Sequence, residues 1–358
     1  MLTVECEQAL AFRVAGHHLH ERTDPLSAVA ACGLQEYPPG WAAVALHARS
    51  RGDLHDADVV TVNAMRGSPY VVPRRDIAVF TTALVPGDDD LRALVGALTA
   101  KELAAEGLTP REALDRVAVA ARDALAGGPL ERDAFHQALR ERVPGALLPW
   151  CRGCQSHHVR PGLWRALGPL GVTVMPAKAT YALAEPTGMD PDEARAELVR
   201  RFLRCFGPAN HSQLAAWAQT APAHAKALFA AVEAELEVVR LEGRRAFVLA
   251  QDVATLERPP AARGLRLLGG HDPYVGQPDR KALAPDPALR KRIFVSVGRP
   301  GLVLHDGALV GLWRARKRGD LLDVTVEWLG EPADVDDEAQ AVARLRGCTE
   351  ARISASPE

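Results

Sequence analysis

Three polar side chains stand in a row at Gln35, Glu36 and Tyr37, directly before two prolines and a glycine. Because proline lacks an N–H and clashes with a preceding helical turn, the stretch CGLQEYPPGW predicts that a helix ends here. On an extended stub, residues i and i+2 project to one side, so we expect Gln35 and Tyr37 to share a face from which Glu36 points away. An amide can hold a water molecule, a carboxylate can act as a base, and a phenol can donate one hydrogen bond.

This stretch and a nearby group of histidines can also be explained by purely structural roles. The stub at Gln35 also fits an exposed turn between helices, in which the amphipathic Tyr37 covers the core. His17, His18 and His20 flank the end of the first predicted helix. We interpret them as cap or surface residues rather than metal ligands.

A second cluster of side chains that could bind a metal consists of Cys151, Cys154, His157 and His158. Two closely spaced thiolates with imidazoles nearby are donors that zinc prefers. Four ligands so close in sequence are cramped for a tetrahedral site, since the second ligand pair usually lies much further along the chain. Reduced thiols at a helix–hairpin junction are therefore favoured, with a structural zinc as the alternative.

The composition is that of a globular protein with several domains. The chain has 358 residues, of which 47% are hydrophobic and 25% are charged, and this length favours more than one core. Six cysteines are too sparse for a disulfide scaffold and fit a reducing compartment. Neither a signal peptide nor a membrane-spanning run is recognisable, so we expect a cytoplasmic protein with no membrane contact.

Positive charge is concentrated in one part of the chain. The net charge is −2, yet the segment from Arg280 to Arg318 carries ten Lys or Arg residues against two Asp. Segregated charge of this kind favours binding to nucleic acid phosphates, although a solvated face is the alternative. The side chains expected to contact DNA are Arg160, Arg314, Arg316 and Lys317.

A pattern of helices followed by a hairpin recurs along the chain. The clearest copy has helices expected from Asp190, from Asn210 and from Pro222, then two strands that turn at Glu242-Gly243. A looser copy begins at Thr109, and a third is expected at the start of the chain. Three helices followed by a β-hairpin are typical of the winged-helix version of helix-turn-helix.

From Gly264 onward, the sequence consists of short runs in which apolar and polar residues alternate. The runs IFVSVG, GLVLHDGALVGLW and LLDVTVEWLG predict a small barrel or curled sheet, and VDDEAQAVARLRG predicts a terminal helix. Within HDPYVGQPDR, we expect Asp272, Tyr274 and Arg280 to form a buried ion-pair staple.

The predicted fold is therefore mostly α with β. Three tandem winged-helix domains are expected at residues 1–83, 84–186 and 187–258, followed by a small β-barrel-like domain with a terminal helix at 259–358.

Three separated motifs carry a family resemblance. In this order, RRFLRCFGPANHSQLAAWA, GGHDPYVGQPDR and DGALVGLWR resemble the AlkZ-like winged-helix DNA glycosylases, and the match extends from about Gln8 to Gly330. The resemblance implies a clamp of three winged helices and a β-barrel on double-stranded DNA, with removal of alkylated or crosslinked bases. We expect no small-molecule cofactor.

The resemblance also implies roles for individual residues. The family's catalytic motif is Gln-x-Gln preceded by Gly-Leu, so Gln35 matches the first glutamine and Tyr37 stands where the second should be. Its Arg-Gly-Thr-x-His stretch on the first wing corresponds to Arg66 and Tyr70, which are expected to contact DNA, with an ordinary wing packed on the first domain as the alternative. Gln35 is expected to position the attacking water, with Tyr37 beside it and Glu36 as a base only if the stub twists.

Two non-enzymatic functions remain as alternatives. The first is a non-catalytic winged-helix DNA-binding protein that lost glycosylase activity when the second glutamine became tyrosine. The second is a winged-helix transcription factor, which is disfavoured because the chain has three tandem units and no sensor domain.

Overall fold

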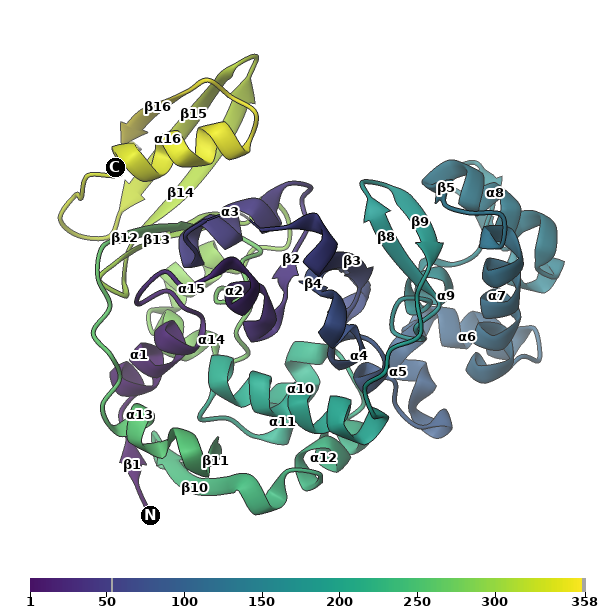
Figure 1. Cartoon of the computed structure of the whole chain (residues 1–358), viewed down its shortest axis with the longest axis horizontal. Coiled ribbons are helices and arrows are strands. Elements are labelled where there is room, and N and C mark those ends of the chain that lie inside the picture. Colours follow the sequence, from purple (N-terminus) through teal and green to yellow (C-terminus); the bar gives the residue numbers. More distant parts are fainter. Residues whose placement is uncertain (53, 356–358) are drawn as a thin grey trace. The chain divides into compact units, whose positions relative to one another are not determined.

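The computed structural model describes residues 1–52 and 54–355, which form two compact units interleaved along the chain (Figure 1). Unit 1 comprises Met1–Leu54, Arg200–Gln213 and Ala234–Glu358, and unit 2 comprises His55–Val199 and Leu214–Glu233. Residues 356–358 of the predicted C-terminal domain lie outside the described range. This division is coarser than the four predicted segments, whose bounds stay predictions.

The chain begins with a short strand, three helices and a hairpin, in the predicted order. The helices are α1 (Cys6–Gly16), α2 (Pro25–Cys32) and α3 (Trp41–Arg49), with the short strands β1 (Thr3–Val4) and β2 (Leu34–Gln35). The hairpin consists of β3 (Val59–Asn63) and β4 (Pro69–Pro73). Helix α2 starts where it does because Asp24 accepts a hydrogen bond from the N–H of Ser27 and Pro25 occupies the first turn.

The same order of elements follows twice more. In the second copy, Thr109 and Glu112 form a capping box at the start of the first helix. Its elements are α7 (Pro110–Leu125), α8 (Arg132–Arg142), α9 (Pro161–Ala166), β8 (Thr173–Ala177) and β9 (Thr180–Leu183). Those of the third copy are α10 (Pro191–Phe206), α11 (His211–Ala218), α12 (Pro222–Ala230), β10 (Leu236–Leu241) and β11 (Arg244–Leu249).

Shorter elements connect these copies. Glu242 and Gly243 both have positive φ and make the predicted turn between β10 and β11. The connecting helices are α4 (Ile77–Phe80), α5 (Leu91–Val95), α6 (Ala97–Ala105), α13 (Val253–Glu257), α14 (Arg280–Leu283) and α15 (Pro287–Ile293). The connecting strands are β5 (Leu130–Glu131), β6 (Trp150–Cys151) and β7 (Ser156–His157).

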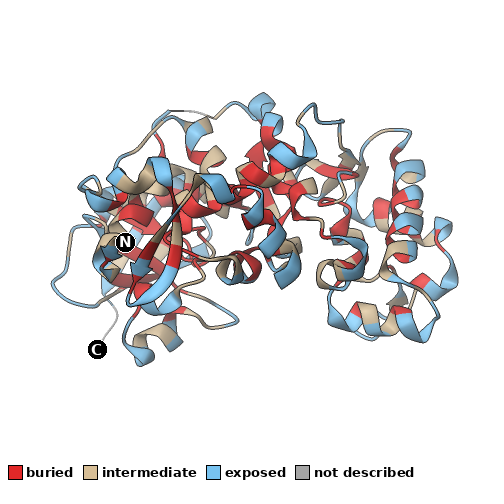
Figure 2. Cartoon of the chain, turned by 90° about the horizontal axis from the view of Figure 1, so that it is seen from below, coloured by how far each residue is buried: buried red, intermediate tan, exposed pale blue. Residues whose placement is uncertain are grey.

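Each unit has its own sheets and core. In unit 2, the strands adjoin in the order β4, β3, β8, β9 and β5, and a core cluster is built around Leu114, Val117, Phe135 and Leu139. In unit 1, β1 pairs in parallel with β10, an addition to the hairpin that was not predicted. Figure 2 shows the buried residues on the inner faces of the helices and strands of each unit.

The C-terminal strands form an open sheet, so the predicted barrel is wrong for the part of the domain that the structure describes. The order is β12 (Leu265–Leu268), β13 (Gly301–His305), β14 (Ala308–Arg318), β15 (Leu321–Trp328) and β16 (Glu350–Ala355). Helix α16 (Asp336–Leu345) makes the crossover that lets β16 join β15 in parallel, which a short hairpin could not do. Strands β12 and β16 therefore remain at opposite edges, and α16 covers the sheet (Figure 1).

One predicted strand is replaced by a helix end. The run IFVSVG was expected to be extended, but α15 continues to Ile293 and the rest of the run is irregular. Asp286 accepts hydrogen bonds from the N–H groups of Ala288 and Leu289, and Pro287 follows the cap. This strong helix start draws the first residue of the run, Ile293, into α15.

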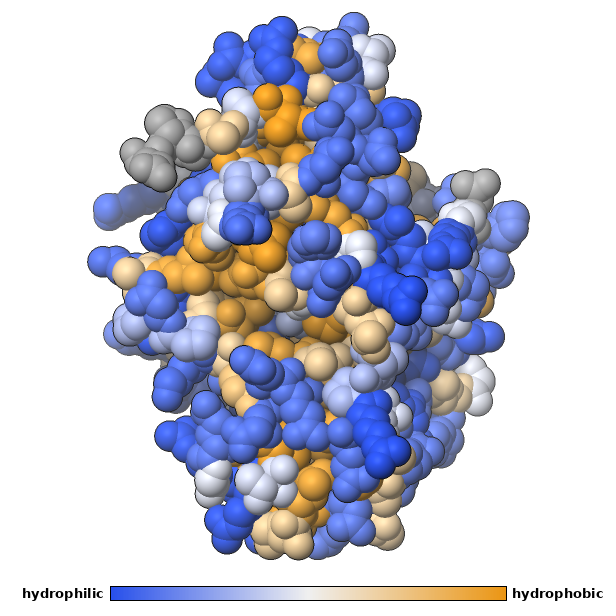
Figure 3. Space-filling view, turned by 90° about the vertical axis from the view of Figure 1, so that its left-hand side faces the viewer, coloured by the Kyte–Doolittle hydropathy of each residue, from blue (hydrophilic) through white to orange (hydrophobic). Residues whose placement is uncertain are grey.

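The outer surface mixes polar and apolar side chains. On the left-hand side of the view in Figure 1, hydrophilic residues surround an apolar band (Figure 3). No helix in the described part of the chain combines the length and the hydropathy needed to cross a bilayer.

Candidate active site and nucleic-acid interface

The stub at Gln35 begins with a backbone reversal after α2. Gly33 has a φ of +68°, a conformation that favours glycine, and it directs the chain into the two-residue strand β2. Gln35 is only 7% exposed, whereas Tyr37 is 53% exposed. The shared exposure expected from alternation is not found, because the extended conformation ends at Gln35 and the chain turns toward α3.

Glu36 anchors the stub to the start of α3. Its carboxylate accepts hydrogen bonds from the N–H groups of Gly40 (2.5 Å) and Ala42 (3.0 Å). These donors belong to the first turn of a helix, where a negative charge is also favoured by the helix dipole. The carboxylate is therefore occupied as a cap of α3.

Tyr37 packs against a loop that is distant in sequence and belongs to the motif GGHDPYVGQPDR. Its ring meets the ring of His271 edge-on, with centroids 5.6 Å apart. Nearby, a Cβ on Gly269 would lie 2.4 Å from the Trp41 ring, so this loop can approach α3 only with glycine at that position. We call residues 269–279 the motif loop.

The motif loop is held by buried polar contacts to α1 and α3. Arg49 and Asp272 form a two-pronged ion pair with N–O distances of 2.7 and 2.5 Å, and both side chains are buried. Arg13 donates to the side chain of Gln277 at 2.8 Å. The predicted staple therefore exists with a different cation, because Asp272 pairs with Arg49 while Arg280 lies exposed over the ring of Phe294.

A buried cluster of His17, Cys32 and Cys205 lies behind the stub. Nδ1 of His17 is 3.6 Å from the sulfur of Cys32, and the Cys205 thiol donates to the carbonyl oxygens of Gly16 and Ala31. The hydrogen bond with Cys205 and burial raise the pKa of the Cys32 thiol well above its usual value. The cluster thus joins the ends of α1, α2 and α10, with Cys32 as a neutral thiol.

The interpretation of His17 as a cap or surface residue is wrong, because it is fully buried. The neighbouring histidines are more exposed. Its packing partners come from other parts of the chain, namely Phe206 and Tyr274, so local sequence carries no signal for its burial.

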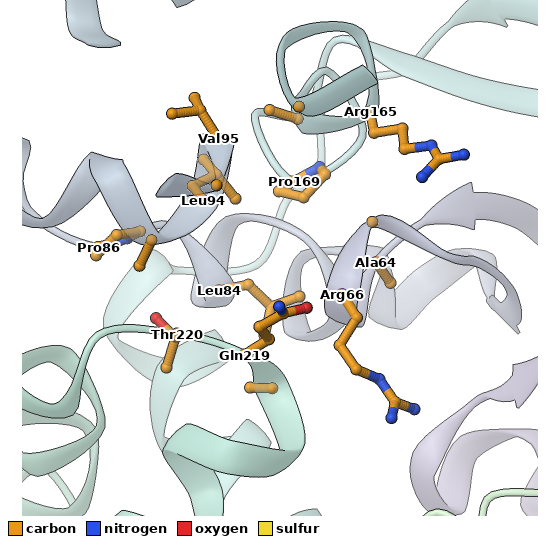
Figure 4. Close-up of a pocket in the computed structure, with 16 residues that line it drawn as sticks. Ala64, Arg66, Leu84, Pro86, Leu94, Val95, Arg165, Pro169, Gln219 and Thr220 are labelled. Carbon is orange, nitrogen blue, oxygen red and sulfur yellow. The ribbon is translucent and has the colours of Figure 1, made fainter. Parts of the chain in front are cut away.

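A cavity of about 170 Å³ lies in unit 2 beside the turn of the first hairpin (Figure 4). Apolar residues of α5 and the segment before it line one side, including Pro86, Leu94 and Val95. Arg66 and Arg165 lie on the other side and extend their guanidinium groups the same way (Figure 4). The cavity combines an apolar wall with two cations, an arrangement that sequence reasoning did not anticipate.

Arg66 and Tyr70 differ in their exposure to solvent. Arg66 lies on the surface in a left-handed backbone conformation, with a φ of +59°. Tyr70 is buried in β4, and its hydroxyl accepts a hydrogen bond from Arg66 Nη2 at 3.3 Å. Tyr70 is thus placed to hold Arg66 rather than to present its own ring, so Arg66 is the stronger candidate for a DNA contact.

Arg160 and the cysteine cluster also lie in unit 2. Arg160 Nη2 forms an ion pair with Glu102 at 2.8 Å, which offsets the positive charge on which its predicted DNA contact depends. The ligand atoms of Cys151, Cys154 and His158 lie within 4.8 Å of one another. The backbone N–H of Cys154 and the His158 side chain lower the pKa of Cys151 to about 7.

The side chains on β14 that are predicted to contact DNA are exposed, but two of them already donate hydrogen bonds to backbone carbonyl oxygens. Lys317 Nζ donates to the carbonyl oxygens of Arg346 (3.1 Å) and Gly347 (2.8 Å), and Arg314 donates to the carbonyl oxygen of Gly298. Arg316 is exposed on the same strand. An open depression of about 510 Å³ elsewhere in the basic segment is lined by four further cations, Arg280, Lys281, Arg290 and Lys291.

Comparison with known proteins supports the resemblance found in the sequence. The solved structure of the Streptomyces sahachiroi DNA glycosylase AlkZ superposes with a TM-score of 0.75 and 23% identity, covering 99% of this chain and 100% of that one. An interstrand DNA cross-link repair glycosylase from Streptomyces sahachiroi is 33% identical over 131 residues, which span 35% of this chain and 35% of that protein. The family model for AlkZ-like DNA glycosylases matches residues 29–346, so the chain belongs to this family.

Proposed function

We propose that this chain is a DNA repair glycosylase, which hydrolyses the N-glycosidic bond of an alkylated or bulky-adduct base in double-stranded DNA. The observation that carries the proposal is the placement of Gln35, which follows Gly33-Leu34 as in the family motif. It is held between the anchored end of α2 and the capped start of α3. A side chain fixed in this way can orient a reactant without reorganising during the reaction.

The reaction suits the side chains at the stub. The bond between the sugar C1′ and the base nitrogen breaks, and the base leaves with the bonding electrons. Water adds to C1′ through a transition state with oxocarbenium character and releases one proton to solvent. A base alkylated at N7 is cationic before the reaction and leaves neutral, so no acid is required to protonate it. Gln35 can then orient the water, with the exposed Tyr37 phenol as a further hydrogen-bond donor.

DNA binding is assigned to the repeated helical units and the basic segment. Each copy has three helices followed by a hairpin, which supports three tandem winged-helix domains, and winged helices bind DNA through a helix and the hairpin. The basic segment from Arg280 to Arg318 adds phosphate contacts. Arg66 and Arg165 beside the cavity in unit 2 are further candidates for such contacts.

Tyr37 in place of the second glutamine favours one alternative, a DNA-binding protein without activity. An oligonucleotide duplex with a single N7-alkylguanine separates the two functions after incubation and mild alkaline cleavage. We expect strand scission at the lesion beyond that of a protein-free control, and none in an unmodified duplex. Binding of the lesion duplex without added scission, on this and on a crosslinked substrate, would assign the chain to the non-catalytic alternative.

Neutralising the basic segment is expected to weaken DNA binding and to flatten its salt dependence. Each lost phosphate contact should reduce the slope of log K against log salt by up to about 0.9. Two triple variants divide the segment, and binding is measured by fluorescence anisotropy across a salt series. The first replaces Arg314, Arg316 and Lys317 with glutamine, and the second replaces Arg280, Lys281 and Lys291.

A matched triple variant controls for net charge alone. Glutamine replaces three exposed cations outside both the repeated units and the basic segment, at Arg258, Arg344 and Arg352. This variant should keep the wild-type salt slope. Equal slopes in all four proteins would remove the basic segment from the DNA interface.

A further inference from the structure

The hairpin between α8 and α9 gathers two thiols and one imidazole at its turn. Strands β6 and β7 pair only through Trp150 with His157 and Cys151 with Ser156. Cys154 lies in the intervening turn, and a Cβ on Gly153 would be 3.9 Å from the Cys151 sulfur, so the first thiol folds back over the turn. The two sulfurs and a ligand nitrogen of His158 lie within 4.8 Å of one another.

The imidazole of His158 is oriented as a metal ligand. Its Nδ1 is 2.8 Å from the carbonyl oxygen of Val159, and because a carbonyl can only accept, Nδ1 carries the proton. The lone pair is therefore on Nε2. This nitrogen is buried and has no nitrogen or oxygen hydrogen-bond partner among the described residues, and the remaining polar neighbour of the imidazole is the Cys151 thiol. Metal-binding histidines commonly have their other nitrogen fixed by such a backbone carbonyl.

His157, the neighbouring histidine, is not part of the cluster. Its Nδ1 bonds to the carbonyl oxygen of Leu148 at 2.7 Å, and its side chain is exposed. The structure thus selects one histidine of the pair. It also removes the crowding of four ligands in a short stretch, since three protein ligands remain.

Few contacts hold the shape of the hairpin, namely the bond of His157 to Leu148, a bond from Gln155 to the Arg152 carbonyl, and the edge-on contact of the Trp150 and His157 rings. A ladder of two residue pairs is too short to be stable alone. Cys151 is half-buried and Cys154 is exposed, so neither thiol is fixed by a surrounding core. A metal bridge between the turn and His158 would supply free energy for ordering this connection.

We propose that Cys151, Cys154 and His158 bind one zinc ion through two thiolates and Nε2, with water in the fourth position. The thiols release their protons to solvent, and the two negative charges balance the dication. Thiolate and imidazole donors select zinc over magnesium or calcium, which prefer oxygen. The exposure of Cys154 leaves room for the fourth ligand. The site does not include Gln35, so the inference stands apart from the proposed function.

The test measures metal content and binding in the full-length chain. Protein purified under reducing conditions is expected to contain about one equivalent of zinc, to lose thermal stability with a chelator, and to regain it when zinc is added. After replacement by Co²⁺, an anaerobic sample should show a thiolate-to-cobalt charge-transfer band. Fully reduced protein that takes up neither metal would overturn the proposal, as would a Cys151–Cys154 disulfide formed in preference to metal uptake.

Variants identify the ligands. Cys151→Ser and Cys154→Ser should each weaken the charge-transfer band, and His158→Ala should lower the affinity for Zn²⁺ measured by competition with a chromophoric chelator. His157→Ala is the matched control and should bind like the wild type. Equal losses from the two histidine variants, or none from His158→Ala, would contradict the assigned ligand set.

Discussion

Gln35→Ala is expected to reduce base release by about 10²-fold or more while leaving DNA affinity nearly unchanged. The amide is assigned an interaction with water that develops in the transition state, and loss of such an interaction lowers the rate rather than substrate binding. Affinity depends mainly on many phosphate contacts, beside which one neutral side chain adds little. Single-turnover base release and anisotropy binding on the same duplex measure the two quantities separately.

Variants of Glu36 and Tyr37 test whether Gln35, rather than a neighbouring side chain, acts on the substrate. Glu36→Gln should retain activity, since the carboxylate caps α3 and the amide oxygen can keep one of its two hydrogen bonds to the helix N–H groups. Tyr37→Gln restores the family motif and should keep or raise the rate, while Tyr37→Phe isolates the contribution of the hydroxyl. Loss of activity in Glu36→Gln with retention in Gln35→Ala would make the carboxylate the base and contradict the assigned role of Gln35.

Asp272→Ala is expected to destabilise unit 1 by about 3–5 kcal/mol, because it leaves the buried Arg49 guanidinium without its counter-charge. The change also removes an acceptor for the N–H of Tyr274, which is bound at 2.9 Å. Urea denaturation followed by circular dichroism should show the transition of unit 1 shifted to lower urea concentration. The motif loop should loosen with it, since Asp272 is one of its main anchors.

Asp323→Ala is the matched control for this loss of stability. Asp323 pairs with Arg318 at 2.8 Å, but the arginine is 62% exposed, so the free energy of unfolding should fall by at most about 1 kcal/mol. If both alanine variants shift the transition equally little, the Arg49–Asp272 pair does not stabilise the fold as its burial indicates.

The repeated helices and hairpins could be predicted because their signals are local. Thr109 with Glu112 marks a helix start, and Glu242-Gly243 marks a hairpin turn, within a few residues of sequence. Strand β16 and the open sheet could not be predicted in this way. A parallel pairing depends on where a crossover helix docks, and that is decided by contacts between residues distant in sequence.

At the candidate site too, local sequence signals could be predicted and contacts between distant residues could not. Motif order led to Gln35, but the helix before it ends at Cys32, where Gly33 reverses the backbone, and not at the Pro38-Pro39 stop. The partners that fix the stub were not predictable, because Cys205, His271 and Arg49 reach it or its supporting loop from distant positions. The two-residue length of β2 also removed the alternation on which a shared face for Gln35 and Tyr37 depended.

The most direct test of the proposed function is detection of the free base. The wild-type chain is incubated with a duplex containing one N7-alkylguanine, and the small-molecule fraction and the oligonucleotide are both analysed by mass spectrometry. The proposed mechanism predicts free alkylated guanine in the same amount as new abasic sites, and neither product above the protein-free background with Gln35→Ala. An intact lesion strand recovered from a duplex that the wild-type chain binds tightly would contradict the proposal.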